Sequence, residues 1–333
     1  MIDYKTQAPD ILKEFLAYHE NIKAHSRRTV DEYYLDLRNF FRYLKRMRNP
    51  ALSRLELDEI DIMDVDLDFV ASVTLTDIYG YLTYLSRDRI QHQNSSQSNY
   101  GLSASSRARK IATIRSFYNY LTNKRHLLRE NPVKDIDSPK LRKTLPKYLT
   151  FDQSTDLLDS VNGKNQERDY CILTLFLNCG LRISELIGLN LTDIHEDTIR
   201  VLGKGNKIRI LYLNDACCEA LNSYLAVRRP ITGRDANALF LSSRNERISR
   251  STVHAMVKNR LTAAGIDSSE YSSHKLRHTA ATLMLQNGVD VRAVQEVLGH
   301  DHLNTTEIYT HVDNEGLRVA AKANPLSKVR KKS

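Results

Sequence analysis

The chain has 333 residues and a formal net charge of +9, from 49 Lys and Arg against 40 Asp and Glu. Hydrophobic residues make up 41% and charged residues 27%, which argues against global disorder. No apolar run is long enough to span a bilayer, the polar N-terminus is unlike a signal peptide, and the four cysteines form no CxxC pair. These features exclude membrane and disulfide-scaffold classes. We expect a cytoplasmic protein whose first candidate partner is nucleic acid.

Residues 1–130 are predicted to form a small domain of four principal helices. Apolar side chains recur there at spacings of three and four, so each helix has one face that packs into a core. The segments with this pattern lie near residues 11–16, 30–44, 76–86 and 107–121. The Ser-rich segment 91–106 predicts a loop that ends in a serine N-cap for the fourth helix.

Charge is unevenly distributed along the chain. Residues 56–68 hold seven acids and no base, whereas residues 78–150 hold fourteen bases and four acids. Three prolines and five Lys or Arg in residues 131–147 predict a basic, extended linker, which we place at 131–149. Such a linker could follow a phosphate backbone or be only a solvated tether.

Residues 150–333 are predicted to form a second, mostly helical domain. Thr150 and Gln153 fit a capping box, and the apolar segment 171–179 predicts a buried helix with Gly180 as its C-cap. Segments 198–202 and 207–213 are rich in Ile, Val and Tyr and flank a glycine-containing turn, which predicts a β-hairpin. Further helices are expected near 215–228, 250–264, 273–286 and 290–298, around Tyr309 and up to Lys322. The predicted fold class is therefore mainly α, with two domains and a small β-hairpin.

Side chains capable of chemistry gather in a few short motifs of the second domain. Arg182 and Glu185 follow the predicted buried helix, and His274 and Arg277 share one face of a predicted helix. His300 follows Leu298-Gly299, Tyr309 comes nine residues later, and Lys204 lies in the hairpin turn.

Each motif also has a plain structural explanation. Arg182 with Glu185 could be a surface ion pair, Lys204 could serve only the turn, and Tyr309 could be a core tyrosine. His274 and His278 have the HxxxH spacing of some zinc sites, but a metalloprotease motif needs Glu where Lys275 stands. No P-loop, GxGxxG or GxSxG motif is present.

The combination of these residues resembles the tyrosine site-specific recombinases of the phage integrase family. Six residues occur in that family's order: Arg182, Lys204, His274, Arg277, His300 and Tyr309. The segments GLRISELIGL, HKLRHTAAT, VQEVLGH and TTEIYTHV are similar to the Xer subgroup. The resemblance extends over almost the whole chain and implies a helical N-terminal DNA-binding domain and a mixed, mostly helical catalytic domain.

The resemblance also implies a mechanism, in which DNA is cut and rejoined through a covalent 3′-phosphotyrosine. Arg182 and Arg277 would grip the nonbridging phosphate oxygens, and His274 and His300 would add hydrogen bonds to them. Lys204 would protonate the departing 5′-oxygen, and Tyr309 would be the nucleophile. Glu185 would orient Arg182 or His274, and the role of His278 stays open. No cofactor or metal is implied.

Partners are implied in the same way. The resemblance implies four protomers, identical or paired with a paralogue, on two specific sites in double-stranded DNA, acting through a Holliday junction. Whether a septal DNA translocase is a further partner stays open. The candidate DNA-binding residues are Arg107, Lys110, Arg115, Lys140, Arg142 and Lys143. Leu317, Val319 and Ala320 could dock on a neighbouring protomer or lie in a solvated tail. Most of the candidate DNA-binding side chains would bind phosphate rather than read bases.

Several functions stay open at this point. Chromosome or plasmid dimer resolution is the expected role, with an integrase or excisionase of a mobile element as the alternative. The loop at 91–106 is longer than a compact Xer-like protein needs, which bears on the subgroup. A type IB topoisomerase, a DNA-binding protein without catalysis and a zinc hydrolase are the remaining hypotheses.

Overall fold

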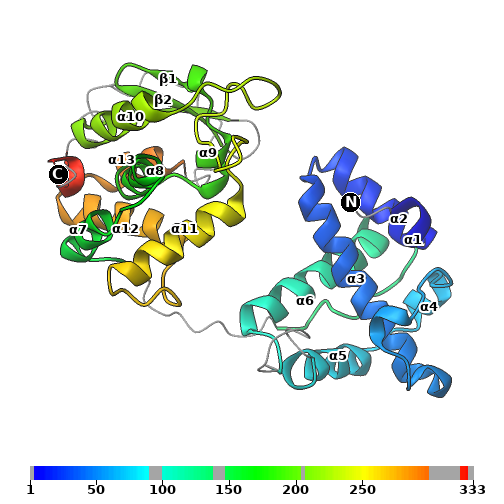
Figure 1. Ribbon diagram of the computed structural model, residues 1–333. Helices are drawn as coiled ribbons and strands as arrows, with labels where there is room; N and C mark the ends of the chain where they lie inside the picture. Colours follow the sequence, from blue (N-terminus) through cyan, green and yellow to red (C-terminus); the bar gives the residue numbers. More distant parts are fainter. Residues whose placement is uncertain (1–3, 90–99, 138–146, 204–206, 300–322, 329–333) are drawn as a thin grey trace. The chain divides into compact units, whose positions relative to one another are not determined.

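A computed structural model describes residues 4–89, 100–137, 147–203, 207–299 and 323–328. The chain divides into two compact units, residues 1–143 and 144–333 (Figure 1). Each unit has a hydrophobic core of its own. Among the helices of the described ranges, none is long and apolar enough to cross a membrane.

The first unit is built mainly from helices. They are α1 (Tyr4–Gln7), α2 (Asp10–Ala17), α3 (Arg27–Arg48), α4 (Leu67–Ala71), α5 (Leu75–Arg87) and α6 (Ala104–Asn119). The four principal helices predicted from apolar spacing are confirmed as α2, α3, α5 and α6. Ser103 is the N-cap of α6 and accepts a hydrogen bond from the main-chain N–H of Ser106, so this helix begins slightly before the predicted end of the loop.

Aromatic side chains form the centre of this first core. The ring of Phe117 on α6 lies 5.3 Å from that of Phe15 on α2 and 5.8 Å from that of Phe41 on α3, both at steep angles. Edge-to-face contacts of this kind are favourable beyond the apolar area that they bury. Three helices that are distant in sequence are thereby packed around one residue.

Part of the predicted linker belongs to this core. Val133 and Ile136 are buried, and the guanidinium of Arg115 on α6 donates hydrogen bonds to both of their carbonyl oxygens. The assignment of residues 131–136 to an extended linker is therefore corrected, because two apolar side chains among the polar ones fix this segment on the helical unit. Of the remainder, residues 138–146 lie outside the described ranges.

The second unit combines helices with a small sheet. Its elements are α7 (Phe151–Asp159), α8 (Gln166–Cys179), α9 (Ile183–Gly188), β1 (Ile194–His195), β2 (Thr198–Leu202), β3 (Ile208–Tyr212), α10 (Asp215–Val227), α11 (Arg250–Ala263), α12 (Ser273–Gln286) and α13 (Val291–Leu298). The strands are antiparallel in the order β1-β2-β3, and Val201 pairs with Arg209. The predicted hairpin is confirmed as β2 and β3, whereas the two-residue strand β1 was not predicted because it is too short to have a pattern.

Helix α8 forms the centre of the second unit. It is buried from Arg168 to Cys179 and packs against α10 and α12, with the other helices around it in Figure 1. The last described segment packs there as well, since Asn324 donates a hydrogen bond to the carbonyl of Leu177. The predicted capping box also forms, with Thr150 and Gln153 bonding each other's main-chain N–H groups.

Gly180 ends α8 in a conformation that only glycine adopts readily. Its φ is +58°, and a Cβ atom built on it would lie 2.5 Å from Cδ2 of Leu298 at the end of α13. The predicted C-cap is therefore confirmed. Its second role, which the sequence does not reveal, is to let the ends of α8 and α13 approach each other.

We expect Gly180→Ala to destabilise the protein more than Gly265→Ala does. Gly265 also has a positive φ, +69°, but a Cβ atom there meets nothing within 4 Å. Backbone strain alone should cost about 1–2 kcal/mol at either position. The clash with Leu298 should add about 1–3 kcal/mol for Gly180→Ala. Chemical denaturation measures both variants, and equal losses would contradict the close approach of the two helices.

Candidate active site

Arg182 and Glu185 form a closed local unit just after α8. Arg182 is the N-cap of α9, and its main-chain N–H donates to Oε2 of Glu185 at 2.8 Å. Its side-chain Nη1 donates to Oε1 of the same carboxylate, also at 2.8 Å. The side chain of Glu185 is 2% exposed and that of Arg182 is 33% exposed. This is therefore a buried carboxylate holding a partly accessible guanidinium, not the surface ion pair considered above.

Arg277 reaches the same place from α12. Its side chain is 4% exposed, its Nη1 lies 3.8 Å from Oε2 of Glu185, and it donates to the carbonyl oxygens of Gly180 and Leu298. Burial, with the nearby Arg182 charge as a second cause, lowers the pKa of Arg277 to about 10. The side chain thus remains a cation at neutral pH. The two arginines that the sequence singles out are brought together on one carboxylate.

A third arginine, Arg209 on β3, completes this arrangement and was missed by the sequence analysis. Its Nη1 and Nη2 donate to Oε1 and Oε2 of Glu185, both at 2.9 Å. Burial alone would raise the pKa of Glu185, but the hydrogen bonds from Arg209 and Arg182 hold it below its ordinary value of 4.5. We call Glu185 with Arg182, Arg209 and Arg277 the arginine cluster.

The arginine cluster has a net charge of +2, from three guanidiniums and one carboxylate. Each guanidinium has five N–H donors, so bonds to Glu185 and to main-chain carbonyls leave further donors on Arg182 and Arg277. Such an arrangement can bind an anion with a planar or tetrahedral set of oxygens, of which phosphate is the obvious case.

The other predicted catalytic residues are placed only in part. His274 is exposed on α12, one turn before Arg277, and His278, the residue after Arg277, is half-buried. Lys204, His300 and Tyr309 lie outside the described residues, as do Leu317, Val319 and Ala320. In the part of the chain that the structure describes, no three His, Cys, Asp or Glu side chains gather as metal ligands would, so the zinc interpretation gains no support.

The candidate DNA-binding residues of the first unit differ sharply from one another. Lys110 is 5% exposed, and its Nζ lies 2.5 Å from Oδ1 of the buried Asp36. Burial lowers the pKa of Lys110 despite that carboxylate. Its assignment as a DNA contact is therefore corrected, because its ammonium group is used inside the fold. Arg107 is half-exposed, with Nη1 donating to the carbonyl of Leu102.

Two other bases of this unit also have partners within the fold. Arg109, which the sequence analysis did not select, is exposed and donates to both carboxylate oxygens of Asp36. Arg115 is half-buried on the carbonyls of the 133–136 segment. Lys140, Arg142 and Lys143 lie outside the described residues.

Comparison with known proteins identifies the class. The phage integrase family matches residues 147–315 of this chain. A tyrosine recombinase XerC of Caldanaerobacter subterraneus is 50% identical over 320 residues, which cover 96% of this chain and 88% of that protein. A tyrosine recombinase XerD of Staphylococcus saprophyticus is 34% identical and covers 92% of this chain and 96% of that protein.

Solved structures share the fold. A λ integrase dimer bound to a COC′ core site superposes with a TM-score of 0.60 at 16% identity, over 89% of this chain and 99% of that one. The XerH site-specific recombinase in a post-cleavage complex with a palindromic difH substrate superposes with a TM-score of 0.60 at 20% identity. The match covers 93% of this chain and 94% of that one. The chain therefore belongs to the phage integrase family, and within it to the tyrosine recombinases of the Xer type. The predicted family and fold class are confirmed.

We expect Glu185→Gln to lower stability most at neutral pH. Removing the carboxylate leaves three guanidiniums without their shared anion, at a cost of about 3–5 kcal/mol. Because the pKa of Glu185 is lower in the folded than in the unfolded state, its contribution is fully present above 4.5 and is lost as the pH falls below that value. The difference in unfolding free energy between wild type and variant should therefore be constant near neutral pH and narrow as the pH falls below 4.5.

Urea denaturation over this pH range checks that expectation. Glu246→Gln, at an exposed carboxylate in a loop, is the control and should follow wild type throughout. A difference in unfolding free energy between wild type and Glu185→Gln that stays constant with pH would mean that the carboxylate charge does not stabilise the cluster.

Proposed function

We propose that this recombinase cuts and rejoins DNA at a specific site through a 3′-phosphotyrosine on Tyr309. The observation that carries the proposal is the arginine cluster, in which Glu185 holds Arg182 and Arg277 from separate helices close to each other. A phosphodiester under attack gains negative charge on its nonbridging oxygens, and two fixed guanidiniums stabilise that charge. Their preorganisation around a buried carboxylate supports these two residues as the phosphate clamp.

The remaining roles follow from the chemistry of the exchange. The phenolate oxygen of Tyr309 forms a bond to phosphorus, and the bond from phosphorus to the 5′-oxygen breaks. Lys204 gives a proton to that leaving oxygen, and His274 accepts the tyrosine proton or, like His300, donates a hydrogen bond to the phosphate. The phosphotyrosine retains the energy of the cleaved bond, so attack by a new 5′-hydroxyl restores the DNA without ATP.

The two units have separate tasks in this proposal. Residues 150–333 carry the chemistry, residues 1–130 bind DNA, and the two are joined between Ile136, which is buried in the first core, and Leu149, which is buried in the second. The proposed DNA contacts are Arg107, Lys140, Arg142 and Lys143; Arg115 is left out because its guanidinium already donates to the carbonyls of Val133 and Ile136. The solved relatives bound to DNA support a duplex as substrate, and a λ integrase tetramer bound to a Holliday junction supports assembly of four protomers on two sites.

The biological role that fits best is resolution of chromosome or plasmid dimers. The names XerC and XerD of relatives that match more than nine-tenths of this chain support it. A heterotetramer with a paralogue and activation by a septal DNA translocase belong to this proposal, as does a cytoplasmic location. Integration or excision of a mobile element is the alternative, since integrases share the fold.

The nucleophile is tested with nicked duplexes that carry dimer-resolution sites, chosen first by gel shift for those that the protein binds. Wild type should give an SDS-resistant DNA–protein adduct, because a nick lets the 5′-hydroxyl fragment diffuse away. Tyr309→Phe should bind equally well and form none. Tyr271→Phe, which removes a half-buried hydroxyl in the same unit, should cleave as wild type does. Binding without any adduct from wild type would favour a DNA-binding protein without catalysis.

The correction at Lys110 gives a second test. Lys110→Met should lower stability by about 1–3 kcal/mol, because Asp36 loses a buried partner. It should leave the salt dependence of DNA binding unchanged. Arg107→Ala should leave stability unchanged and reduce the slope of log K for DNA binding against log salt concentration by about one. A reduced slope for Lys110→Met at unchanged stability would restore Lys110 as a phosphate contact.

A further inference from the structure

The side chain of Arg209 on β3 makes hydrogen bonds to two other elements of the second unit. Its side chain is 15% exposed, and all three of its nitrogens are engaged. Two of them bond the two oxygens of Glu185, and Nε donates to the carbonyl of Val297 on α13 at 3.2 Å. One guanidinium therefore links strand β3, helix α9 and helix α13.

The end of α13 shows what this link does. The last carbonyls of a helix have no partner within it. Here three consecutive carbonyls are taken by the three arginines of the cluster: Val297 by Arg209, Leu298 by Arg277 and Gly299 by Arg182. Because the three arginines also converge on Glu185, the end of this helix and the proposed phosphate clamp share one set of bonds.

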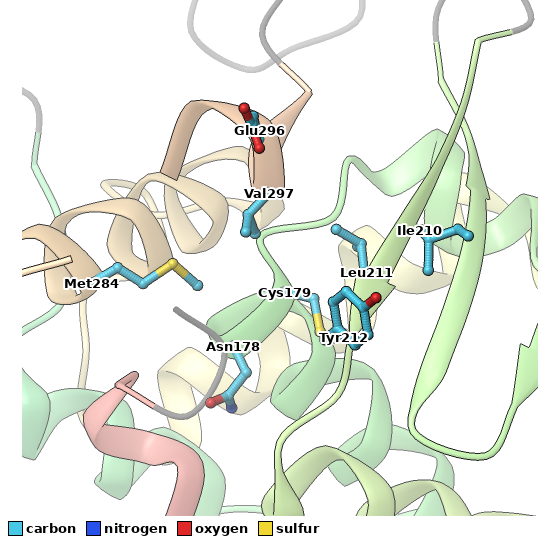
Figure 2. Close-up of a pocket in the computed structure, with 8 residues that line it drawn as sticks. All are labelled: Asn178, Cys179, Ile210, Leu211, Tyr212, Met284, Glu296 and Val297. Atoms are coloured by element: carbon cyan, nitrogen blue, oxygen red, sulfur yellow. The ribbon is translucent and has the colours of Figure 1, made fainter. Parts of the chain in front are cut away.

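Gly299 leaves room for the Arg209 guanidinium. A Cβ atom on Gly299 would lie 3.1 Å from Nη1 and 3.2 Å from Cδ of Arg209, and one on Gly203 would lie 3.5 Å from the same Nη1. The two distances at Gly299 are tighter than an ordinary Cβ contact, whereas the one at Gly203 is an ordinary van der Waals contact, so Arg209 fills the space between the hairpin and α13. The same two elements also line the small pocket of Figure 2, with Ile210 and Leu211 from β3 and Val297 from α13.

We propose that Arg209 is a positioning residue for strand cleavage: it fixes Glu185, and through it Arg182 and the end of α13, in the geometry that receives the scissile phosphate. The inference rests on the proposed function. Each of the three nitrogens of Arg209 bonds a protein oxygen, and in this proposal its effect on the phosphate comes through Glu185 and Arg182.

The substitution Arg209→Lys separates the effect of positioning from the effect of positive charge. Arg209→Lys keeps the positive charge but has one ammonium group, which cannot bond both oxygens of Glu185 and the Val297 carbonyl together. Misplacement of a clamp by about 1 Å can cost about 100-fold in rate, and we expect a loss of this order in adduct formation at saturating protein. The affinity for the same nicked duplex should be unchanged.

The matched control is Arg200→Lys. Arg200 lies on the neighbouring strand β2 of the same hairpin and also bonds a carboxylate, that of Asp193, through Nε and Nη2. This substitution should leave both cleavage and binding as in wild type. Circular dichroism and thermal melting confirm that each variant is folded.

A second pair of variants probes Arg209 from α13 and decides the question if Arg209→Lys does not fold. Gly299→Ala places a methyl group against the guanidinium, whereas Gly288→Ala, also at a positive φ of +82°, meets nothing within 4 Å. Slower cleavage with Gly299→Ala alone, at unchanged DNA affinity, supports the proposal.

The outcomes separate this inference from the function on which it rests. A wild-type adduct together with wild-type cleavage rates for Arg209→Lys and Gly299→Ala overturns the role of Arg209 only. A lower melting temperature for Arg209→Lys with an unchanged cleavage rate at saturating protein also overturns it, because Arg209 would then be only structural. Binding by wild type without an adduct overturns the proposed function and this inference with it.

Discussion

The buried carboxylate of Glu185 is the interaction on which the site depends. Three guanidiniums could not lie together in a largely buried region without an anion among them, because both desolvation and mutual repulsion oppose it. Glu185 bonds two of them directly and lies 3.8 Å from the third, and its own pKa is lowered as a result. The remaining net charge of +2 would stabilise a phosphodiester under attack, because its transition state is more anionic than its ground state.

Backbone geometry places these charges as firmly as the carboxylate does. Helices α8 and α13 both end in a left-handed glycine, Gly180 and Gly299, so their C-termini expose carbonyl oxygens and partial negative charge toward the cluster. The arginines donate to these carbonyls, and the close approach of Gly180 to Leu298 keeps the two ends together. Glycine at these two positions is thus a requirement of the site and not only of the helices.

Local features of the fold could be predicted because they depend on near neighbours in sequence. Apolar spacing located the principal helices, the Thr150–Gln153 box and Gly180 fixed helix ends, and a glycine turn between β-rich segments indicated the hairpin. Arg209 was missed because its partners, Glu185 and Val297, are 24 and 88 residues away, and an arginine on a short strand gives no local sign of burial. Lys110 was misassigned for the same reason, because its buried partner Asp36 is 74 residues away on α3.

The first unit shows why a count of charges is a poor measure of DNA contact. Lys110 and Arg109 bond the buried Asp36, and Arg115 bonds the carbonyls of Val133 and Ile136, so three bases of the strongly positive stretch already serve the fold. A cation that is bonded inside the protein releases no counterion when DNA binds, unless that bond is broken at a cost. The salt dependence of binding should therefore report the bases left free by the fold, which are fewer than the sequence contains.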